Sequence, residues 1–328
     1  MALHRTQAEG RATFTYGNVT LQHTQRNTPS LFGAGVIDKI SNNTLVALEG
    51  QAIQQRQQFQ QQAQGTRVVF ESDNTRTPTL RRFGWKGQTP TLKAFVAGAC
   101  ANELGLQTKG MPQAVSATEP GYRADYVDMT EKQLDELVAH VASLPPPRRL
   151  TPHNPEEEAA IARGALLFGQ ARCQTCHVPD LESALGIYSD LQLHHMGDRL
   201  ADAAGSALAV STPRGLPQQA VLPEDYDDPA KVETRPTPPP KAVSQPRPTP
   251  AQAYFGEVSI GVATMWRTPP LWGVRDSAPY LHDGRAATLE AAIEMHTGEA
   301  EESATRFRNL SSTDRADLVA FVRSVGAP

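Results

Sequence analysis

The chain has 328 residues, of which 39% are apolar and 20% are charged, so it is long enough for two domains that each bury a core. Its 31 basic and 35 acidic side chains give a net charge of −4 with both signs interspersed, which argues against a nucleic-acid-binding protein. No apolar run approaches the roughly 20 residues of a membrane span, and three cysteines are too few for a disulfide scaffold.

The first half carries helix signals but no Cys-x-x-Cys-His motif. Residues 51–64 hold nine glutamines, a composition typical of either a solvated helix or a low-complexity loop, and we assign them no chemical role. Cys100 stands apart from the other two cysteines, so we expect it to be a small buried residue. Three prolines follow Leu144 and break any helix, so we place a domain boundary near residue 150, between domains at 1–150 and 151–328.

The second half opens with a predicted helix at residues 156–172. Glu156 to Glu158 suit its first turn, and Ile161, Ala165 and Phe168 form an apolar stripe at helical spacing. Further on, residues 213–250 contain eleven prolines among polar residues. This composition favours extended, solvated chain, so we interpret it as an exposed insertion.

Cys173, Cys176 and His177 form a Cys-x-x-Cys-His motif directly after the predicted helix. In such a motif the two thiols attach haem covalently and the histidine ligates iron. A zinc knuckle would need further ligands at knuckle spacing, and a thioredoxin-like dithiol would need a βαβ context. The sequence offers neither context, so it predicts one covalent haem c in this chain.

The sixth iron ligand decides between an electron carrier and an open catalytic site, because a vacant position accepts small oxidants such as peroxide. Spacing alone does not choose among the histidines and methionines of the second half. The candidates are His296, Met265, Met196, Met295, His194 and His195.

Three segments of the first half recur in the second half in the same order, as in a duplicated unit. The matches are Thr28–Gly33 with Thr268–Gly273, Trp85–Leu92 with His282–Leu289, and Glu136–Leu144 with Asp317–Val325. We therefore predict a mainly α protein of two cytochrome c-like domains related by internal duplication. Only 27 residues, none of them cysteine, precede Thr28. We expect the first domain to be incomplete and a longer parent chain to carry a second haem motif upstream.

Several of these segments resemble the bacterial di-haem cytochrome c peroxidase superfamily, and are most similar to its di-haem oxidoreductase, thiol oxidoreductase-like branch. The resemblance runs from about residue 14 to the end, interrupted by the proline-rich insertion. It is carried by Leu31–Ile37, Arg82–Lys86, Trp266–Gly273, Tyr280–Ala286 and His296–Ala300. It implies a catalytic haem in the N-terminal domain and an electron-delivering haem, here held by Cys173, Cys176 and His177, in the C-terminal domain.

The resemblance also assigns roles to single residues. His296 occupies the place of the ligand of the delivering iron, and Trp85 that of a tryptophan that relays an electron between the haems. Glu103, in Glu103-Leu-Gly105, corresponds to the acid-base glutamate of the peroxidase site. Two departures are the missing first haem motif and Leu193–Gly197, where the family's Leu-His-Asp-Met-Gly reads Leu-His-His-Met-Gly.

We thus expect a periplasmic haem c oxidoreductase that exchanges electrons with a redox donor or acceptor protein and uses peroxide or another small oxidant. Two alternatives stay open. One is a single-haem electron carrier with a structural first domain, and the other is a non-catalytic remnant. The alternative for Trp85 is a structural role as a core aromatic, and the alternative for Glu103 is a carboxylate on a helix surface.

Overall fold

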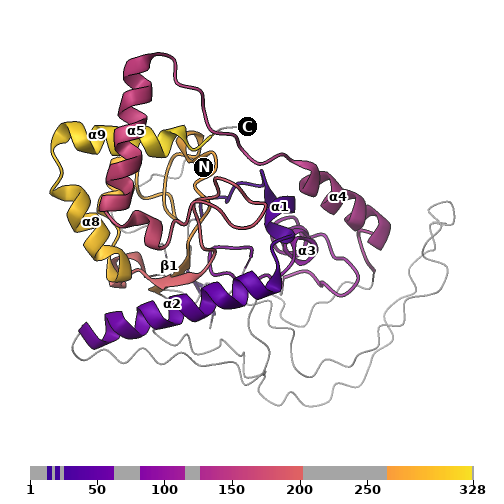
Figure 1. The fold of residues 1–328 in the computed structure, drawn as a ribbon. Helices are drawn as coiled ribbons and strands as arrows, with labels where there is room; N and C mark the ends of the chain where they lie inside the picture. Colours follow the sequence, from indigo (N-terminus) through magenta and orange to yellow (C-terminus); the bar gives the residue numbers. More distant parts are fainter. Residues whose placement is uncertain are drawn as a thin grey trace, which may run out of the picture.

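The computed structural model describes residues 13–16, 19–22, 26–62, 82–114, 126–201 and 264–326. These residues form a mainly α-helical protein with two short antiparallel strand pairs (Figure 1). The insertion predicted at 213–250 lies outside them. Within the described ranges, no helix is both long enough and apolar enough to cross a bilayer.

In its described residues, the first half contains a hairpin followed by four helices. Strands β1 (Thr13–Tyr16) and β2 (Val19–Gln22) pair antiparallel, with Thr13 opposite Gln22. The helices are α1 (Ala34–Asp38), α2 (Asn42–Gln62), α3 (Leu92–Glu103) and α4 (Glu131–Ser143). The glutamine-rich stretch is therefore helical as far as Gln62, and α2 runs along one edge of the molecule (Figure 1).

The second half begins with α5 (Pro155–Gln170), which confirms the helix predicted at 156–172. The other helical elements that the structure describes in this half are η1 (Cys173–Thr175), η2 (Asp198–Leu200), η4 (Val274–Asp276), α7 (Leu289–Glu294), η5 (Gly298–Ala300), α8 (Glu301–Arg308) and α9 (Ser312–Ser324). Strand β3 (Leu193–His195) pairs antiparallel with β4 (Met265–Arg267), with His194 opposite Trp266.

Several helices start where the sequence supplies a side-chain cap. Asn154 accepts a hydrogen bond from the Glu157 amide at the start of α5, and Pro155 occupies the first helical position, where no amide hydrogen is needed. Thr130 and Gln133 form a reciprocal capping box at the start of α4. Each such cap contributes about 1 kcal/mol to helix stability.

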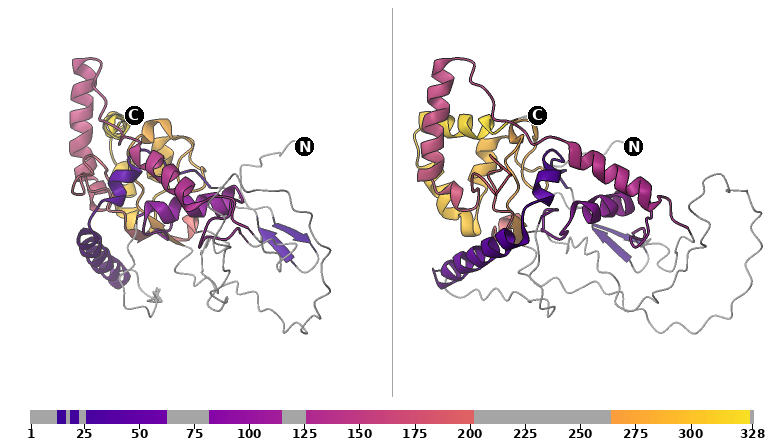
Figure 2. Two further views of the ribbon diagram at one scale, coloured as in Figure 1. Left: turned by 90° about the vertical axis from the view of Figure 1, so that its right-hand side faces the viewer. Right: turned by 45° about the vertical axis from the view of Figure 1, so that its right-hand side comes forward.

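Helices α5 and α9 cross at close range, and both views in Figure 2 show them against each other. Gly164 makes the crossing possible, because a Cβ there would lie 2.0 Å from the Asp317 carbonyl oxygen. Beside it, Arg163 donates two hydrogen bonds to the buried Asp317 carboxylate, at 2.6 and 3.2 Å. The crossing fixes the helix that leads directly into the haem motif.

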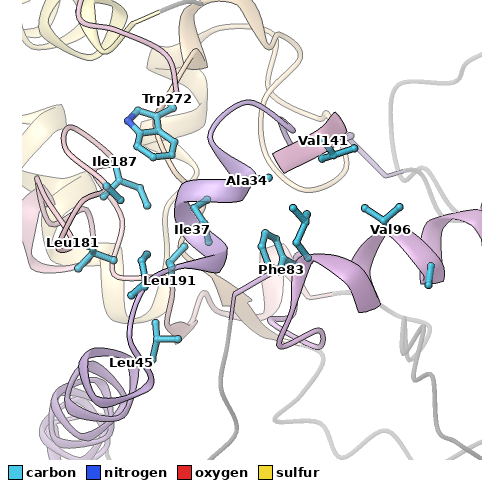
Figure 3. Packing of buried hydrophobic residues seen from close by; sticks show 14 of the residues in the cluster. Ala34, Ile37, Leu45, Phe83, Val96, Val141, Leu181, Ile187, Leu191 and Trp272 are labelled. Carbon is cyan, nitrogen blue, oxygen red and sulfur yellow. The ribbon is translucent and has the colours of Figure 1, made fainter. Parts of the chain in front are cut away.

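Two apolar clusters stabilise the fold. The first joins α1, α3 and α4 to residues of the second half, including Leu181, Ile187, Leu191 and Trp272 (Figure 3). The second lies among α5, α7, α8 and α9 and includes the fully buried Phe307. Cys100 is buried in the first cluster, as the sequence predicted. Because that cluster uses residues from both sides of residue 150, the two halves share a core.

Segments that recur in the sequence make corresponding backbone contacts. The Gly33 amide donates to the Leu144 carbonyl at 3.2 Å, and the Gly273 amide donates to the Val325 carbonyl at 3.1 Å. These four residues occupy matching positions in the repeated segments. Isolated bridges also match, one between Phe83 and Thr89 and the other between Tyr280 and Ala286.

The two halves also exchange equivalent hydrogen bonds. The Asn27 amide donates to the His282 carbonyl at 2.8 Å, and the Arg267 amide donates to the Trp85 carbonyl at 2.8 Å. Asn27 and Arg267 each precede a Thr-Pro segment, and Trp85 and His282 each begin the second repeated segment. A donor of each half thus bonds the matching acceptor of the other.

Candidate functional site

The Cys-x-x-Cys-His motif lies on a tight turn after α5. Arg172 takes a left-handed conformation with φ of 63°, which ends the helical path, and η1 follows at once. The amides of Cys176 and His177 both donate to the Cys173 carbonyl, at 3.4 and 3.0 Å. The turn is therefore set by local backbone bonds and brings all three side chains to the wall of one cavity.

That cavity measures about 500 Å³, within the range typical of small-molecule and cofactor sites. Its wall draws on both halves of the chain. In the second half it is largely apolar, with side chains from α5, α7 and α9 that include Phe168, Leu289, Ile293, Leu318 and Val322.

His177 is held in a defined tautomer. Its Nδ1 donates to the Tyr188 carbonyl at 2.8 Å, which leaves Nε2 with a free lone pair. Phe168 packs beside the imidazole with ring centroids 6.4 Å apart. Burial lowers the pKa of His177 to about 4, so the ring is neutral at pH 7, which is the form that binds a metal.

His296 shares these properties on the same cavity wall. Its Nδ1 donates to the Ala292 carbonyl at 2.7 Å, one turn back at the C-terminal end of α7, and burial lowers its pKa. The two histidines lie close enough that a charge on His296 would lower the pKa of His177. Two neutral imidazoles therefore line the cavity, and neither uses its Nε2 in a hydrogen bond to a described residue.

The other sixth-ligand candidates differ in position. Met196 lines the cavity. Met265 is buried in β4, Met295 is 37% exposed, and neither is on the cavity wall; His195 is not on it either. His194 lines the cavity but uses both ring nitrogens, Nε2 toward Asp190 at 2.7 Å and Nδ1 toward Glu299 at 2.9 Å.

The Cys173 thiol is poorly suited to zinc binding or dithiol redox chemistry. Burial raises the pKa of Cys173 to about 12, so this group stays a neutral thiol, whereas zinc sites and redox dithiols use thiolates. Cys176, Asp190 and His194 place their ligand atoms within 4.8 Å of one another. His194 already bonds a carboxylate through each ring nitrogen, so it has no lone pair left for a metal.

A buried guanidinium on the cavity wall suits a ligand that carries carboxylates. Arg267 is 5% exposed, and its Nε donates to the Gly84 carbonyl at 2.7 Å. Its Nη1 is buried with no hydrogen-bond partner among the described residues, and burial lowers the pKa to about 10 against the opposing charge of Asp190. Haem carries two propionates, so the apolar wall, the two imidazoles and Arg267 together fit this cofactor.

Trp85 lies on the same wall within an aromatic group. Its Nε1 donates to the Asn27 carbonyl at 2.7 Å, and its ring meets His282 edge-on at 6.5 Å. His282 in turn stacks on Trp266 with centroids 3.5 Å apart, and Lys86 Nζ sits 3.3 Å from the Trp266 centroid. In the sequence, Trp266 stands out only as the first residue of the family segment Trp266–Gly273. Its stacking on His282 became visible only when β4 and the 280–286 loop were brought together.

Glu103 lies elsewhere. It ends α3, is exposed, and does not line the cavity. The structure thus brings Cys173, Cys176, His177, His296 and Trp85 to one cavity and leaves Glu103 outside it.

Comparison with known proteins gives the family. The chain matches the family described as "Di-haem oxidoreductase, putative peroxidase" over residues 8–211 and 260–325. The interruption coincides with the proline-rich stretch predicted to be an insertion. The fold and the site define a mainly α-helical protein with a haem-attachment motif. This protein belongs to the di-haem oxidoreductase family. The family implies haem as the cofactor.

Among solved structures, the chain is similar to hydrazine synthase of Kuenenia stuttgartiensis, with 19% identity, a TM-score of 0.36, and coverage of 63% of this chain and 59% of that one. It is also similar to a MauG-like protein associated with microbial copper homeostasis, with 16% identity, a TM-score of 0.32, and coverage of 58% and 52%. The chain therefore matches less than two thirds of either structure's length. No curated protein sequence matches it.

Proposed function

We propose that this chain is a haem c electron-transfer oxidoreductase in which Cys173 and Cys176 attach the haem and His177 and His296 ligate its iron. The observation that carries this proposal is the pair of neutral imidazoles, each held through Nδ1 by a backbone carbonyl on the wall of the cavity that both cysteines line. When bound, the haem supplies one-electron redox chemistry, and two histidine ligands favour electron transfer over binding of an oxidant.

The chain's own residues would position and tune this cofactor. His177 is oriented by Tyr188 and supported by Phe168, while Arg267 offers a positive charge to a propionate. We assign Trp85 as the relay toward the first half, supported by its place on the cavity wall beside His282. For Glu103, an acid-base role rests on the family resemblance alone, because its side chain lies outside this cavity.

We further propose that the two halves, divided near residue 150, are duplicated cytochrome c-like domains. The matching hydrogen bonds of Gly33 and Gly273, and the exchanged bonds of Asn27 and Arg267, support this proposal. By the family resemblance, the first half would be the catalytic side of the protein, with peroxide or another small oxidant as substrate and a redox protein as electron donor. Covalent haem attachment favours a periplasmic location.

A single-haem electron carrier is the second candidate. Cys173–His177 is the only Cys-x-x-Cys-His motif in the 328 residues, and the cavity holds two histidines suited to a closed, six-coordinate iron. Peroxide turnover with a reduced donor protein would favour the oxidoreductase, whereas electron exchange without turnover would favour the carrier.

The test is haem content and spin state of the full chain, made with an export signal and the haem-maturation machinery. Intact mass and the pyridine haemochrome spectrum should give one covalent haem in the wild type and none in a Cys173→Ala, Cys176→Ala double variant. The ferric wild type should be low-spin, and His296→Gly should become high-spin. The neighbouring Met295→Ala should leave the spectrum unchanged, since Met295 is off the cavity wall. A low-spin His296→Gly protein whose Met196→Ala counterpart is high-spin would replace His296 with Met196 as the ligand.

A further inference from the structure

A buried histidine, His194, bridges two carboxylates at the wall of the cavity. The His194 ring, 2% exposed, contacts Asp190 Oδ2 through Nε2 at 2.7 Å and Glu299 Oε2 through Nδ1 at 2.9 Å. The side chains of Asp190 and Glu299 are 7% and 6% exposed. Since both ring nitrogens face carboxylates, His194 donates from both and carries a positive charge.

The first carboxylate belongs to the segment that follows the haem motif. The Asp190 amide donates to the Cys176 carbonyl at 2.9 Å, and the neighbouring Ser189 amide donates to the Val178 carbonyl at 2.9 Å. These bonds join residues 189–190 directly to the turn that carries Cys176 and His177. The Asp190 arm of the bridge is therefore anchored to the segment that carries His177.

The second carboxylate lies three residues after His296. Glu299 Oε1 accepts the His195 amide at 2.7 Å, so one carboxylate bonds both His194 and the next residue of β3. The Thr297 hydroxyl donates to the Met196 carbonyl. At Gly298, with φ of 61°, a Cβ would lie 2.1 Å from the His195 carbonyl oxygen, so the two backbones touch. The segment after His296 is thus fastened to β3.

Stability alone does not account for this arrangement. Burying an ion pair costs about as much in desolvation as the attraction returns, and an apolar replacement is often as stable. The two carboxylates are the hydrogen-bond partners of the His194 ring, one at each nitrogen. What the bridge supplies is a fixed link between residues 189–190, which are bonded to the haem-motif turn, and residues 297–299, which follow His296.

We propose that His194 is a positioning residue. By bridging Asp190 and Glu299, it holds the segment after His296 against residues 189–190, which are bonded to the haem-motif turn. It would thereby keep the haem iron six-coordinate. This inference rests on the proposed function, because it takes His296 as the sixth ligand. Loss of the bridge frees the 296–299 segment, and the iron spends part of its time with an open sixth position.

The experiment compares full-length, haem-loaded variants. Glu299→Ala removes the arm on the His296 side, His194→Leu removes both arms, and Glu299→Gln keeps the side-chain shape and the acceptor for the His195 amide. The matched control is Asp317→Ala, which breaks the ion pair between the buried Asp317 carboxylate of α9 and the half-exposed Arg163 of α5, in the same half of the chain. Haem content, ferric spin state and the rate of cyanide binding are measured for each protein.

We expect Glu299→Ala and His194→Leu to keep one covalent haem, gain a high-spin component, and bind cyanide at least about tenfold faster, as when an open state rises from about 1% to 10%. Glu299→Gln should restore most of the low-spin spectrum. Asp317→Ala should lower the unfolding midpoint and stay low-spin, which separates positioning from general stability. If His194→Leu does not fold, Glu299→Ala decides, because it leaves His194 paired with Asp190.

Bridge variants that keep one haem, a wild-type low-spin spectrum and a wild-type cyanide rate would overturn the inference while leaving the proposed function intact. A high-spin Asp317→Ala protein would also overturn it, because any loss of stability would then open the iron. A wild type without covalent haem, or a low-spin His296→Gly variant, would instead refute the proposed ligand set and the inference with it.

Discussion

Replacing Phe168 with alanine should strongly destabilise the second half of the protein, because this ring joins the α5–α9 core to the haem motif. Phe168 is 4% exposed, and its ring centroid lies 5.2 Å from that of Phe321 and 5.9 Å from that of Tyr188. It also lies 6.4 Å from His177. Truncating a buried phenylalanine costs about 3–5 kcal/mol through lost burial and the cavity left behind.

That loss is large against a typical folding free energy of about 5–15 kcal/mol. With an m-value of about 3 kcal/mol per molar urea, the midpoint should fall by roughly 1 to 1.7 M. Urea unfolding followed by circular dichroism measures it, and the haem absorption should change at the same urea concentration if His177 loses its support in the same step.

Two variants on the same helix serve as controls. Phe168→Leu keeps most of the apolar volume and should lose less than half as much stability. Leu166→Ala changes a side chain that is 68% exposed and should shift the free energy of unfolding by no more than about 0.5 kcal/mol. If Phe168→Ala unfolded at the wild-type midpoint, the aromatic cluster would not be the core of this half, and the reasoning would fail.

Two further predictions concern helix packing and pH. Gly164→Ala should lower the melting temperature although alanine is the better helix former by about 1 kcal/mol, because its Cβ would meet the Asp317 carbonyl; Gly169→Ala, whose Cβ has no neighbour closer than 3.6 Å, should be neutral or stabilising. Melting curves give the sign, and a stabilised Gly164→Ala would disprove the close crossing. Burial lowers the pKa of His282 to about 3, against the raising effect of Asp283, so between pH 6.5 and 3 the unfolded chain binds a proton that the folded chain does not. The free energy of unfolding should therefore decrease as the pH is lowered from 6.5 to 3, by up to about 1.4 kcal/mol per pH unit. His282→Phe should reduce this slope in urea titrations at several pH values, and an unchanged slope would show that His282 is protonated in the fold.

The elements with strong local signals were predictable. The helix at 156–172 was identified from its acidic first turn and apolar stripe, and the structure has it at Pro155–Gln170. The composition of the glutamine-rich stretch is compatible with either a helix or a loop, because it has no apolar stripe, and the structure has its residues up to Gln62 in α2. The boundary near residue 150 stays a prediction, since the first apolar cluster draws on residues from both sides of it.

At the site, the sequence could name the haem motif but could not choose a sixth ligand. Spacing left six side chains eligible and only the family resemblance favoured His296, because ligation depends on which side chains reach one cavity and which ring nitrogens are unused. His194 illustrates the limit. Its sequence neighbours give no sign that Glu299, more than a hundred residues away, occupies its Nδ1.

What the sequence determined by itself is what covalent chemistry and local propensity encode. Haem attachment requires a Cys-x-x-Cys-His spacing that can be recognised in the sequence alone, and the recurrence of three short segments is visible there too. Only the tertiary structure decided which distant side chains meet. It brought His296 to the cavity that the motif lines, closed His194 between two carboxylates and stacked His282 on Trp266. These contacts depend on how the chain closes over long separations, so no local pattern records them.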